Sequence, residues 1–152
     1  MSDRLSWDQY FLTITRQVAE RSTCARAKVG AVIVRDTNIL ATGYNGSPAG
    51  LPHCIDVGCL IYRSVTPAGE EEENCFRTIH AEINAITQVA KNGASIREGH
   101  IYITHSPCIQ CFKVLINTGI SRVVFEKEYK LHTLAELRQY THVRLERVDM
   151  PR

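Results

Sequence analysis

The chain of 152 residues is long enough for one domain, spanning residues 1–152, with a hydrophobic core that needs no disulfide to hold it together. Its 18 basic and 16 acidic side chains leave a net charge of +2, which argues against a nucleic-acid-binding surface. The N-terminal segment lacks the apolar region of a secretory signal and no apolar run approaches ~18 residues, so we expect a cytoplasmic protein (of the host cell, if the gene is viral) that does not contact membranes.

The first half of the chain predicts one helix, one pair of strands and a long irregular segment. Apolar residues recur at helical spacing from about Leu5 to Arg21. Two apolar runs within residues 29–44, separated by a turn at residues 36–38, predict two strands joined as a hairpin. Residues 45–77 contain repeated glycines and prolines, which exclude long regular elements. Such a stretch is rare in a compact domain unless it is functional or held by a bound group.

The second half of the chain alternates helices with strands. Ser106 and Pro107 predict the cap and the first position of the middle helix. The expected helices are residues 79–91, 106–119 and 130–140, and the expected strands are residues 100–104, 120–126 and 142–148. The order of elements predicts a three-layer α/β/α fold, in which helices cover both faces of a five-stranded mixed sheet.

Six cysteines in a chain without a secretory signal favour metal binding or catalysis over a disulfide framework. Cys108 and Cys111 are three residues apart at the start of a predicted helix, so both sulfur atoms can face one point. The partial positive charge of a helix N-terminus favours their thiolate forms. With His80, which opens another predicted helix, they provide three zinc ligands and leave the fourth tetrahedral position open, as in catalytic zinc sites.

Glu82 follows His80 by two positions, a spacing at which two side chains of a regular helix point roughly 200° apart. The two residues can serve one site only in the first turn, where both reach over the end of the helix. Glu82 can then exchange protons with a water molecule beside the metal. The alternative is an exposed carboxylate that only stabilises the helix dipole.

The combination H-x-E…P-C-x-x-C, here His80, Glu82 and residues 107–111, resembles the cytidine-deaminase-like zinc superfamily. The segments STCARAKVGAVIV, TGYNGSPAGLPHC and EYK are similar to those of deoxycytidylate deaminases, and the similarity runs from about residue 20 to 130. The resemblance implies zinc-dependent hydrolysis of dCMP to dUMP and ammonia. It also implies that Glu82 is the catalytic residue, which carries a proton from water to the ring and then returns one to the leaving amine.

The same resemblance implies a substrate site formed by Asn45, Ala81, Tyr129, Arg26 and Lys28. Asn45 would bind the sugar 3′-hydroxyl, Tyr129 would stack near the base and phosphate, and the two cations would bind the phosphate. From the residues alone, the alternatives are that Asn45 is a turn residue and Tyr129 a packed surface tyrosine. The alternative for the two cations is that they are solvated charges.

The other four cysteines are spread over the first half of the chain. The resemblance implies a structural zinc in this region, which would stabilise residues 45–77. Its expected ligands are Cys24, Cys54, Cys59 and Cys75. His53 can replace one of them or lie at the rim of the active site. Four free thiols are the alternative.

Deoxycytidylate deaminases are commonly hexamers that dCTP activates and dTTP inhibits, each together with Mg²⁺. The resemblance therefore implies a homohexamer with an effector loop at Gly46, Ser47 and Gly50, where small residues let phosphate groups approach the backbone. A plain glycine–proline turn is the alternative for this loop. Other functions to be tested are deamination of cytidine, deoxycytidine, dCTP or an RNA base, and zinc binding without catalysis.

Overall fold

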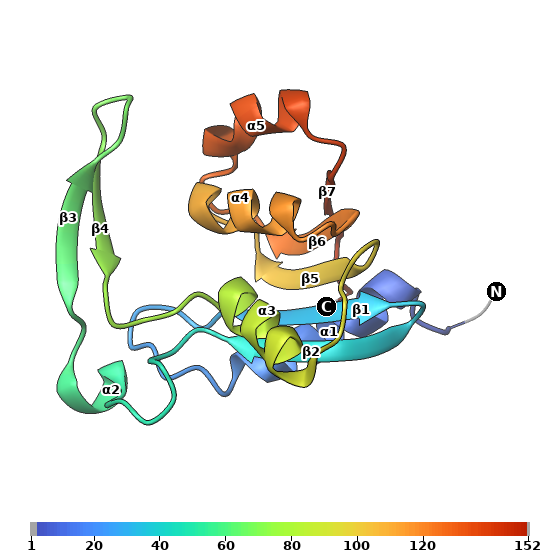
Figure 1. Ribbon diagram of the computed structural model, residues 1–152, viewed down its shortest axis with the longest axis horizontal. Helices are drawn as coiled ribbons and strands as arrows, with labels where there is room; N and C mark the ends of the chain where they lie inside the picture. The colour runs from blue at the N-terminus through green and yellow to red at the C-terminus, as the bar shows by residue number, and fades with distance from the viewer. Residues whose placement is uncertain (1–2, 152) are drawn as a thin grey trace.

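A computed structural model describes residues 3–151 and shows a five-stranded sheet between two helical layers (Figure 1). The elements are α1 (Trp7–Ala19), β1 (Gly30–Arg35), β2 (Asn38–Tyr44), α2 (Cys54–Val57), β3 (Ile61–Val65), β4 (Glu71–Cys75), α3 (Ala81–Asn92), β5 (His100–His105), α4 (Ile109–Asn117), β6 (Arg122–Lys127), the 3-10 helix η1 (Leu131–Leu134), α5 (Ala135–Tyr140) and β7 (Arg144–Arg147). The domain expected over residues 1–152 includes residues 1, 2 and 152, which lie outside the described range.

The sheet has the strand order β2-β1-β5-β6-β7. β1 is antiparallel to both β2 and β5, whereas β5, β6 and β7 run parallel to one another. The predicted five-stranded mixed sheet and three-layer α/β/α fold are therefore confirmed. Among the described residues, no helix is long and apolar enough to cross a membrane.

Side chains that alternate along the central strands fill two separate cores. In β1, Ala31 and Ile33 join the core beneath α3, α4 and η1, while Val32 and Val34 face α1. β5 and β6 alternate in the same way. Each fully buried aliphatic or aromatic side chain in these cores contributes about 1.5–3 kcal/mol. The sheet therefore holds helices firmly on both of its faces.

Close contact between α3 and the sheet depends on a glycine in β2. A Cβ atom at Gly43 would overlap the carbonyl oxygen of Ala81 and the backbone nitrogen of Ala85. Only glycine lets the first two turns of α3 lie this close to the strand. This packing fixes the N-terminal end of α3, where His80 and Glu82 lie.

The predicted ends of several helices differ from the structure, and the helix expected over residues 130–140 is divided into η1 and α5. α1 has Ser6 as its N-cap in a capping box with Gln9, so it begins later and ends earlier than residues 5–21. α4 begins at Ile109 with Cys108 as its N-cap, not at Pro107 with Ser106 as its cap. The Ser106 hydroxyl is used elsewhere, because it accepts a hydrogen bond from Tyr129 N (2.6 Å) and donates one to Tyr129 O (3.0 Å).

Residues 45–77 form no long regular element, as expected, but the segment is not irregular throughout. This segment contains the short helix α2 and an antiparallel hairpin of β3 and β4, which stands apart from the main sheet (Figure 1). The glycines and prolines that suggested an irregular segment lie between these elements. Gly58 ends α2, while Gly69, with φ of 84°, lies in the turn between the strands. The residues that break regular structure here mark the ends of the strands.

Candidate functional site

His80, Cys108 and Cys111 bring three metal-binding atoms together at the N-termini of α3 and α4. His80 is the N-cap of α3, and Cys108 is the N-cap of α4. Nδ1 of His80 lies 3.5 Å from Sγ of Cys108 and 3.3 Å from Sγ of Cys111. The three atoms all lie within 4.8 Å of one another. This spacing fits one zinc ion with Zn–S distances of about 2.3 Å and Zn–N distances of about 2.0–2.1 Å.

The surroundings of these residues favour the protonation state that zinc needs at Cys108. Hydrogen bonds with Cys111 and with His80 lower the pKa of the Cys108 thiol to about 4. A thiolate at a helix N-terminus is a strong metal ligand. Cys111 is buried, whereas His80 is exposed, so the group opens to solvent on one side.

Glu82 lies in the first turn of α3 beside these atoms. Its side chain is only 4% exposed, and burial raises the pKa of its carboxyl group, while a hydrogen bond with the Cys111 thiol opposes that shift. An exposed carboxylate that only stabilises the helix dipole does not describe this residue. Ala81, between His80 and Glu82, is fully buried in the core, so its methyl group cannot contact a ligand.

Asn45 is buried, and its side chain holds the loop between α1 and β1 in place. Oδ1 accepts hydrogen bonds from Val29 N (2.9 Å) and Ser22 Oγ (2.6 Å), and Nδ2 donates to Ala27 O (2.8 Å). One N–H of the amide has no partner among the described residues. Asn45 therefore supports this loop, with one donor left for a ligand.

The other residues expected at the substrate site lie in different surroundings. Tyr129 is 45% exposed and follows β6. The Arg26 guanidinium faces the carbonyl oxygen of Glu73 in β4, at 3.4 and 3.5 Å. Lys28 instead forms an exposed ion pair with Glu20 at 2.9 Å. The sequence interpretation missed Lys130, which pairs with Glu72 of the hairpin and directly follows Tyr129 in EYK.

Cys54, Cys59 and Cys75 form a second group of metal-binding atoms, also within 4.8 Å of one another. Cys54 Sγ is 3.7 Å from Cys75 Sγ, and Cys75 Sγ accepts a hydrogen bond from Leu60 N at 3.3 Å. Cys24 lies outside this group, but its thiol is near enough to help raise the pKa of Cys59, after burial and the other two thiols. The group lies at the base of the β3–β4 hairpin.

A cavity of about 510 Å³ lies between α3 and β2, where it reaches His53 and the loop after Asn45. Its lining includes Thr23 and Ser47, whose hydroxyl oxygens are buried without a hydrogen-bond partner among the described residues. His53 lines this cavity and does not join the thiol group. The backbone of Gly46 pairs with that of Ile79, which links the loop to the residue before His80. Gly50, in the same loop, has φ of 83°.

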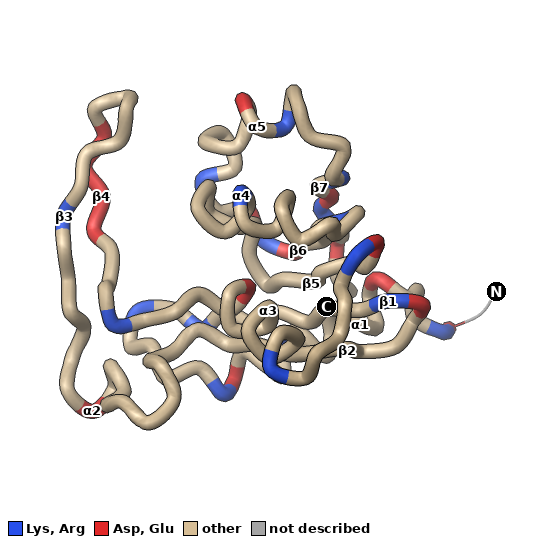
Figure 2. Tube along the Cα trace, in the orientation of Figure 1, with Lys and Arg blue, Asp and Glu red and all other residues tan. Residues whose placement is uncertain are grey.

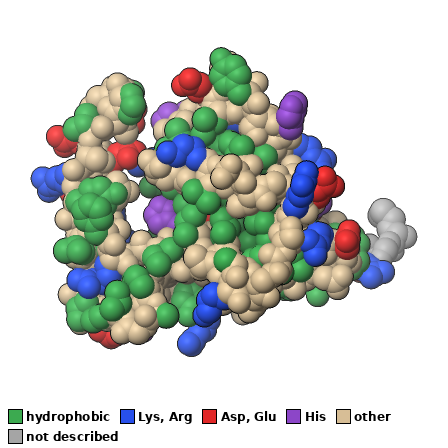
Figure 3. All heavy atoms as spheres, in the orientation of Figure 1, with side chains coloured by type: hydrophobic (Ala, Val, Ile, Leu, Met, Phe, Trp, Pro, Cys, Tyr) green, Lys and Arg blue, Asp and Glu red, His purple; other side chains and the backbone are tan. Residues whose placement is uncertain are grey.

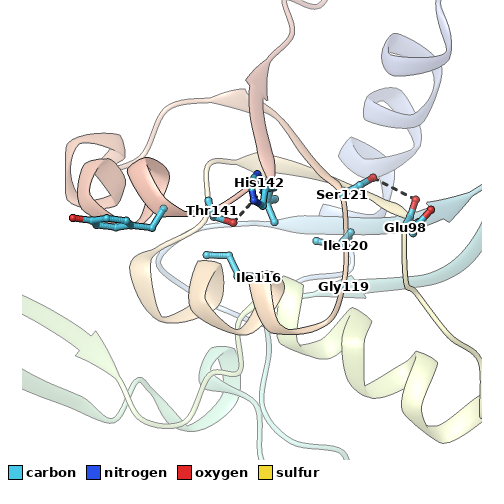
Figure 4. A pocket seen from close by; sticks show the side chains of 9 residues that line it. Glu98, Ile116, Gly119, Ile120, Ser121, Thr141 and His142 are labelled. Atoms are coloured by element: carbon cyan, nitrogen blue, oxygen red, sulfur yellow. Dashed lines mark hydrogen bonds between the residues drawn. The ribbon is translucent and has the colours of Figure 1, made fainter.

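A second cavity, of about 430 Å³, lies where β6 and β7 begin (Figure 4). Its lining includes Glu98, Ser121 and His142, together with Ile116 of α4 and Val143, which precedes β7. None of the site residues expected from the sequence lines it.

Comparison with known proteins gives a consistent family assignment. Residues 5–127 match the family model of the cytidine and deoxycytidylate deaminase zinc-binding region. The chain is 46% identical to ComE operon protein 2 of Bacillus subtilis over 97% of this chain and 74% of that protein. It is 37% identical to deoxycytidylate deaminase of Mycobacterium phage D29, over 82% of this chain and 98% of that one. The crystal structure of dCMP deaminase from cyanophage S-TIM5, in complex with dCMP and dUMP, superposes with a TM-score of 0.76 at 28% identity, covering 97% of this chain and all of that one.

Proposed function

This chain belongs to the cytidine and deoxycytidylate deaminase family of zinc-binding proteins, and on that premise we propose that it hydrolyses dCMP to dUMP and ammonia. His80, Cys108 and Cys111 would hold the catalytic zinc. The observation that carries the proposal is the buried carboxyl group of Glu82 beside these three ligand atoms. A zinc-binding module without catalysis has no use for an acid placed there.

Glu82 acts as the proton carrier of the reaction. When bound, zinc supplies the positive charge that lowers the pKa of a coordinated water to about 7. Glu82 takes one proton from the attacking water and gives it to N3 of the cytosine ring, while the oxygen adds to C4. It then moves the remaining proton of that oxygen to the amine, the C4–N bond breaks, and ammonia leaves. The carboxyl group is regenerated in each turnover, and its raised pKa suits a group that both accepts and donates protons.

The proposed substrate site combines Asn45, Tyr129, Arg26 and the backbone of Ala81. The free N–H of Asn45 would bind the sugar hydroxyl, and the exposed ring of Tyr129 would stack near the base. Lys28 has less support as a phosphate ligand, because it is exposed and paired with Glu20.

Ammonia release from dCMP, deoxycytidine, cytidine, dCTP and a cytosine-containing RNA tests this substrate assignment. We expect dCMP to give the highest kcat/KM. Equal rates with dCMP and deoxycytidine would contradict a nucleotide substrate, and a higher rate with dCTP or RNA would identify a different one. No ammonia from any of them, in zinc-loaded protein, would contradict enzyme function.

We also propose that the second thiol group binds a structural zinc. Cys54, Cys59 and Cys75 already lie at ligand spacing, and Cys24 is the nearby thiol suited to be the fourth ligand. Metal analysis of the purified protein should give two zinc ions per chain. One zinc ion per chain, with four titratable thiols, would contradict the structural zinc site.

Regulation by dCTP and dTTP with Mg²⁺, in a cytoplasmic homohexamer, is the last part of the proposed function. The cavity between α3 and β2 supports an effector site, because it is lined by Thr23 and Ser47, whose hydroxyls have no hydrogen-bond partner among the described residues. Titration of each triphosphate into the dCMP assay tests the regulation, and sedimentation analysis tests the hexamer. Hyperbolic dCMP kinetics that neither triphosphate changes would contradict the regulation.

A further inference from the structure

Ser106 fastens the connection between β5 and α4 to the segment that follows β6. Its side chain is only 3% exposed. The hydroxyl accepts a hydrogen bond from Tyr129 N (2.6 Å) and donates one to Tyr129 O (3.0 Å). The backbone nitrogen of Ser106 donates a third hydrogen bond, to Lys127 O (2.8 Å). One residue of this connection is therefore held by three hydrogen bonds.

The segment that holds Ser106 is itself fixed at both ends. Only residues 128–130 separate β6 from η1. β6 is paired with β5 on one side and with β7 on the other, and Leu134 of η1 is fully buried in the core. The backbone of Tyr129 thus has little freedom to move. Its two hydrogen bonds with the Ser106 hydroxyl attach the β5–α4 connection to a firm part of the fold.

The β5–α4 connection lies on the side of the molecule that faces the β3–β4 hairpin. β5 and β6 both end on this side (Figure 1), and the surface is hollowed between the hairpin and the rest of the molecule (Figure 3). Residues 106–111 include no charged side chain, so the tube between β5 and α4 is tan in Figure 2. The connection therefore cannot be fixed by an ion pair of its own, and its position depends on neutral hydrogen bonds such as those of Ser106.

Cys108 lies two residues beyond Ser106. The ring of Pro107, between them, fixes its own φ near about −65° and restricts the residue before it to extended conformations. Two residues span at most about 7 Å. A shift of Ser106 would therefore also move the Sγ atom of Cys108.

The two cysteines of the catalytic group differ in how α4 holds them. Cys111 lies within the helix, is 2% exposed and is followed by the fully buried Phe112. Cys108 is the half-buried N-cap. Its carbonyl oxygen accepts a hydrogen bond from Phe112 N (2.9 Å), and its Sγ accepts one from Cys111 N (3.5 Å). Packing thus positions Cys111, whereas the position of Cys108 also depends on the chain that precedes it.

We propose that Ser106 is a positioning residue that sets the place of Cys108 as a ligand of the catalytic zinc, an inference that rests on the proposed function. Without the hydroxyl, the backbone of Tyr129 loses two hydrogen bonds, and residues 106–108 gain freedom to move. The Cys108 thiolate is then no longer held at ligand spacing from His80 and Cys111. Zinc binds more weakly, and a bound ion is less well placed relative to the Glu82 carboxyl group.

Zinc affinity and kinetics of Ser106→Ala and Ser106→Thr test this inference. Ser106→Ala should lose one zinc ion per chain at roughly a tenth of the chelator concentration that removes it from the wild type, as is usual when a metal ligand loses the group that orients it. With zinc and dCMP both saturating, its kcat should still be roughly 10- to 100-fold lower, because a displacement of about 1 Å has effects of this size. KM should change no more than a few-fold. Ser106→Thr keeps the hydroxyl and should restore most of both losses.

Ser121→Ala is the matched control. Ser121 directly precedes β6, at the opposite end of this strand from Tyr129, and its hydroxyl also donates a hydrogen bond to a backbone carbonyl, Gly99 O at 3.2 Å. Zinc affinity, kcat and KM should all remain as in the wild type.

Unchanged zinc affinity in a folded Ser106→Ala protein would overturn the inference. An unfolded Ser106→Ala protein, detected by circular dichroism, would overturn it as well, because the hydroxyl would then support the whole fold. A rise in KM alone would show that the hydroxyl acts on Tyr129 and not on Cys108, and equal losses in Ser106→Thr would show that the hydroxyl is not the cause. The chelator titration needs no turnover, so weaker zinc binding by Ser106→Ala would support the inference even if the wild type released no ammonia from dCMP.

Discussion

The two groups of metal-binding side chains offer similar chemistry on very different supports. His80, Cys108 and Cys111 lie at the ends of helices that pack on a buried sheet. Cys54, Cys59 and Cys75 lie at the base of a hairpin that stands apart from that sheet (Figure 1). In the first group the packed helices hold the ligands in place before metal binds. In the second group, bound metal would instead stabilise the segment that carries the ligands. This difference predicts how each group responds to mutation.

Cys108→Ser should have the largest effect of the variants that test the comparison. Without this thiolate the catalytic zinc is lost and turnover should fall to background, by more than the roughly 10²- to 10⁴-fold that a proton-carrying group contributes. The melting temperature should change little, because the cores around α3 and α4 remain intact. Metal analysis, an ammonia assay and thermal denaturation measure the three quantities. An unfolded Cys108→Ser protein would show that metal supports this region too.

Gly43→Ala tests the rigid support directly. The new methyl group would press on the backbone of α3 at Ala81 and Ala85. Overpacking of this kind costs about 1–3 kcal/mol of the free energy of unfolding. It should also lower turnover, since α3 carries His80 and Glu82. Urea denaturation measures the first effect, with Thr42→Ala on the exposed side of the same strand as the control. Wild-type stability in Gly43→Ala would mean that α3 is not held this closely.

Cys59→Ser tests the second group, and its effect on turnover should be much smaller than that of Cys108→Ser. Zinc should fall from two ions per chain to one, and the 45–77 segment should become sensitive to protease because metal binding there contributes to folding. Turnover should fall a few-fold, because the catalytic ligands are untouched while the segment between Asn45 and His80 loses its support. Protease resistance and a full zinc content in Cys59→Ser would refute a structural metal. His53→Ala is the matched control and should retain both ions, because His53 faces the α3–β2 cavity.

The smallest expected effect is that of pH on the free energy of unfolding, through the hydrogen-bond network that joins α1 to the sheet. Hydrogen bonds from Arg122 to both oxygens of Asp8 (2.7 Å each) hold the pKa of this carboxyl below its usual 3.8, and Tyr102 adds a third. The folded state therefore binds fewer protons than the unfolded state as pH falls. The stabilising contribution is fully present above about pH 4 and is lost as pH falls through the lowered pKa. Asp8→Asn should reduce the dependence of the free energy of unfolding on pH between pH 5 and 2, as measured by denaturation. The same dependence in Asp8→Asn and wild type would contradict this role of Asp8.

The sequence predicted the parts of the fold that follow from periodic burial. Alternating apolar residues in β1, β5 and β6 contribute to two cores, so the central strands and their helices were recognisable. His80, Cys108 and Cys111 were found for a related reason, because short spacings at helix starts bring side chains together without long-range information. Their meeting in the structure depends on α3 and α4 packing into the same core on one face of the sheet.

The hairpin and the Lys130–Glu72 pair were not predicted, because neither leaves a periodic signal. β3 and β4 are five residues each and their inner side is polar, so the alternation that marks a strand on a core is absent. Ser106 was interpreted as a helix cap because its local sequence fits that role, whereas its actual partner, Tyr129, is 23 residues away. Contacts at such distances follow from the fold as a whole.

Turnover of dCMP by zinc-loaded Glu82→Gln protein tests the central claim most directly. Glutamine keeps the size of the side chain but cannot accept and return a proton. We predict a folded protein with the same zinc content as the wild type and a kcat that is at least roughly 10²- to 10⁴-fold lower. A zinc-loaded, folded Glu82→Gln protein with nearly wild-type kcat would contradict the proposed role of Glu82 and with it the mechanism.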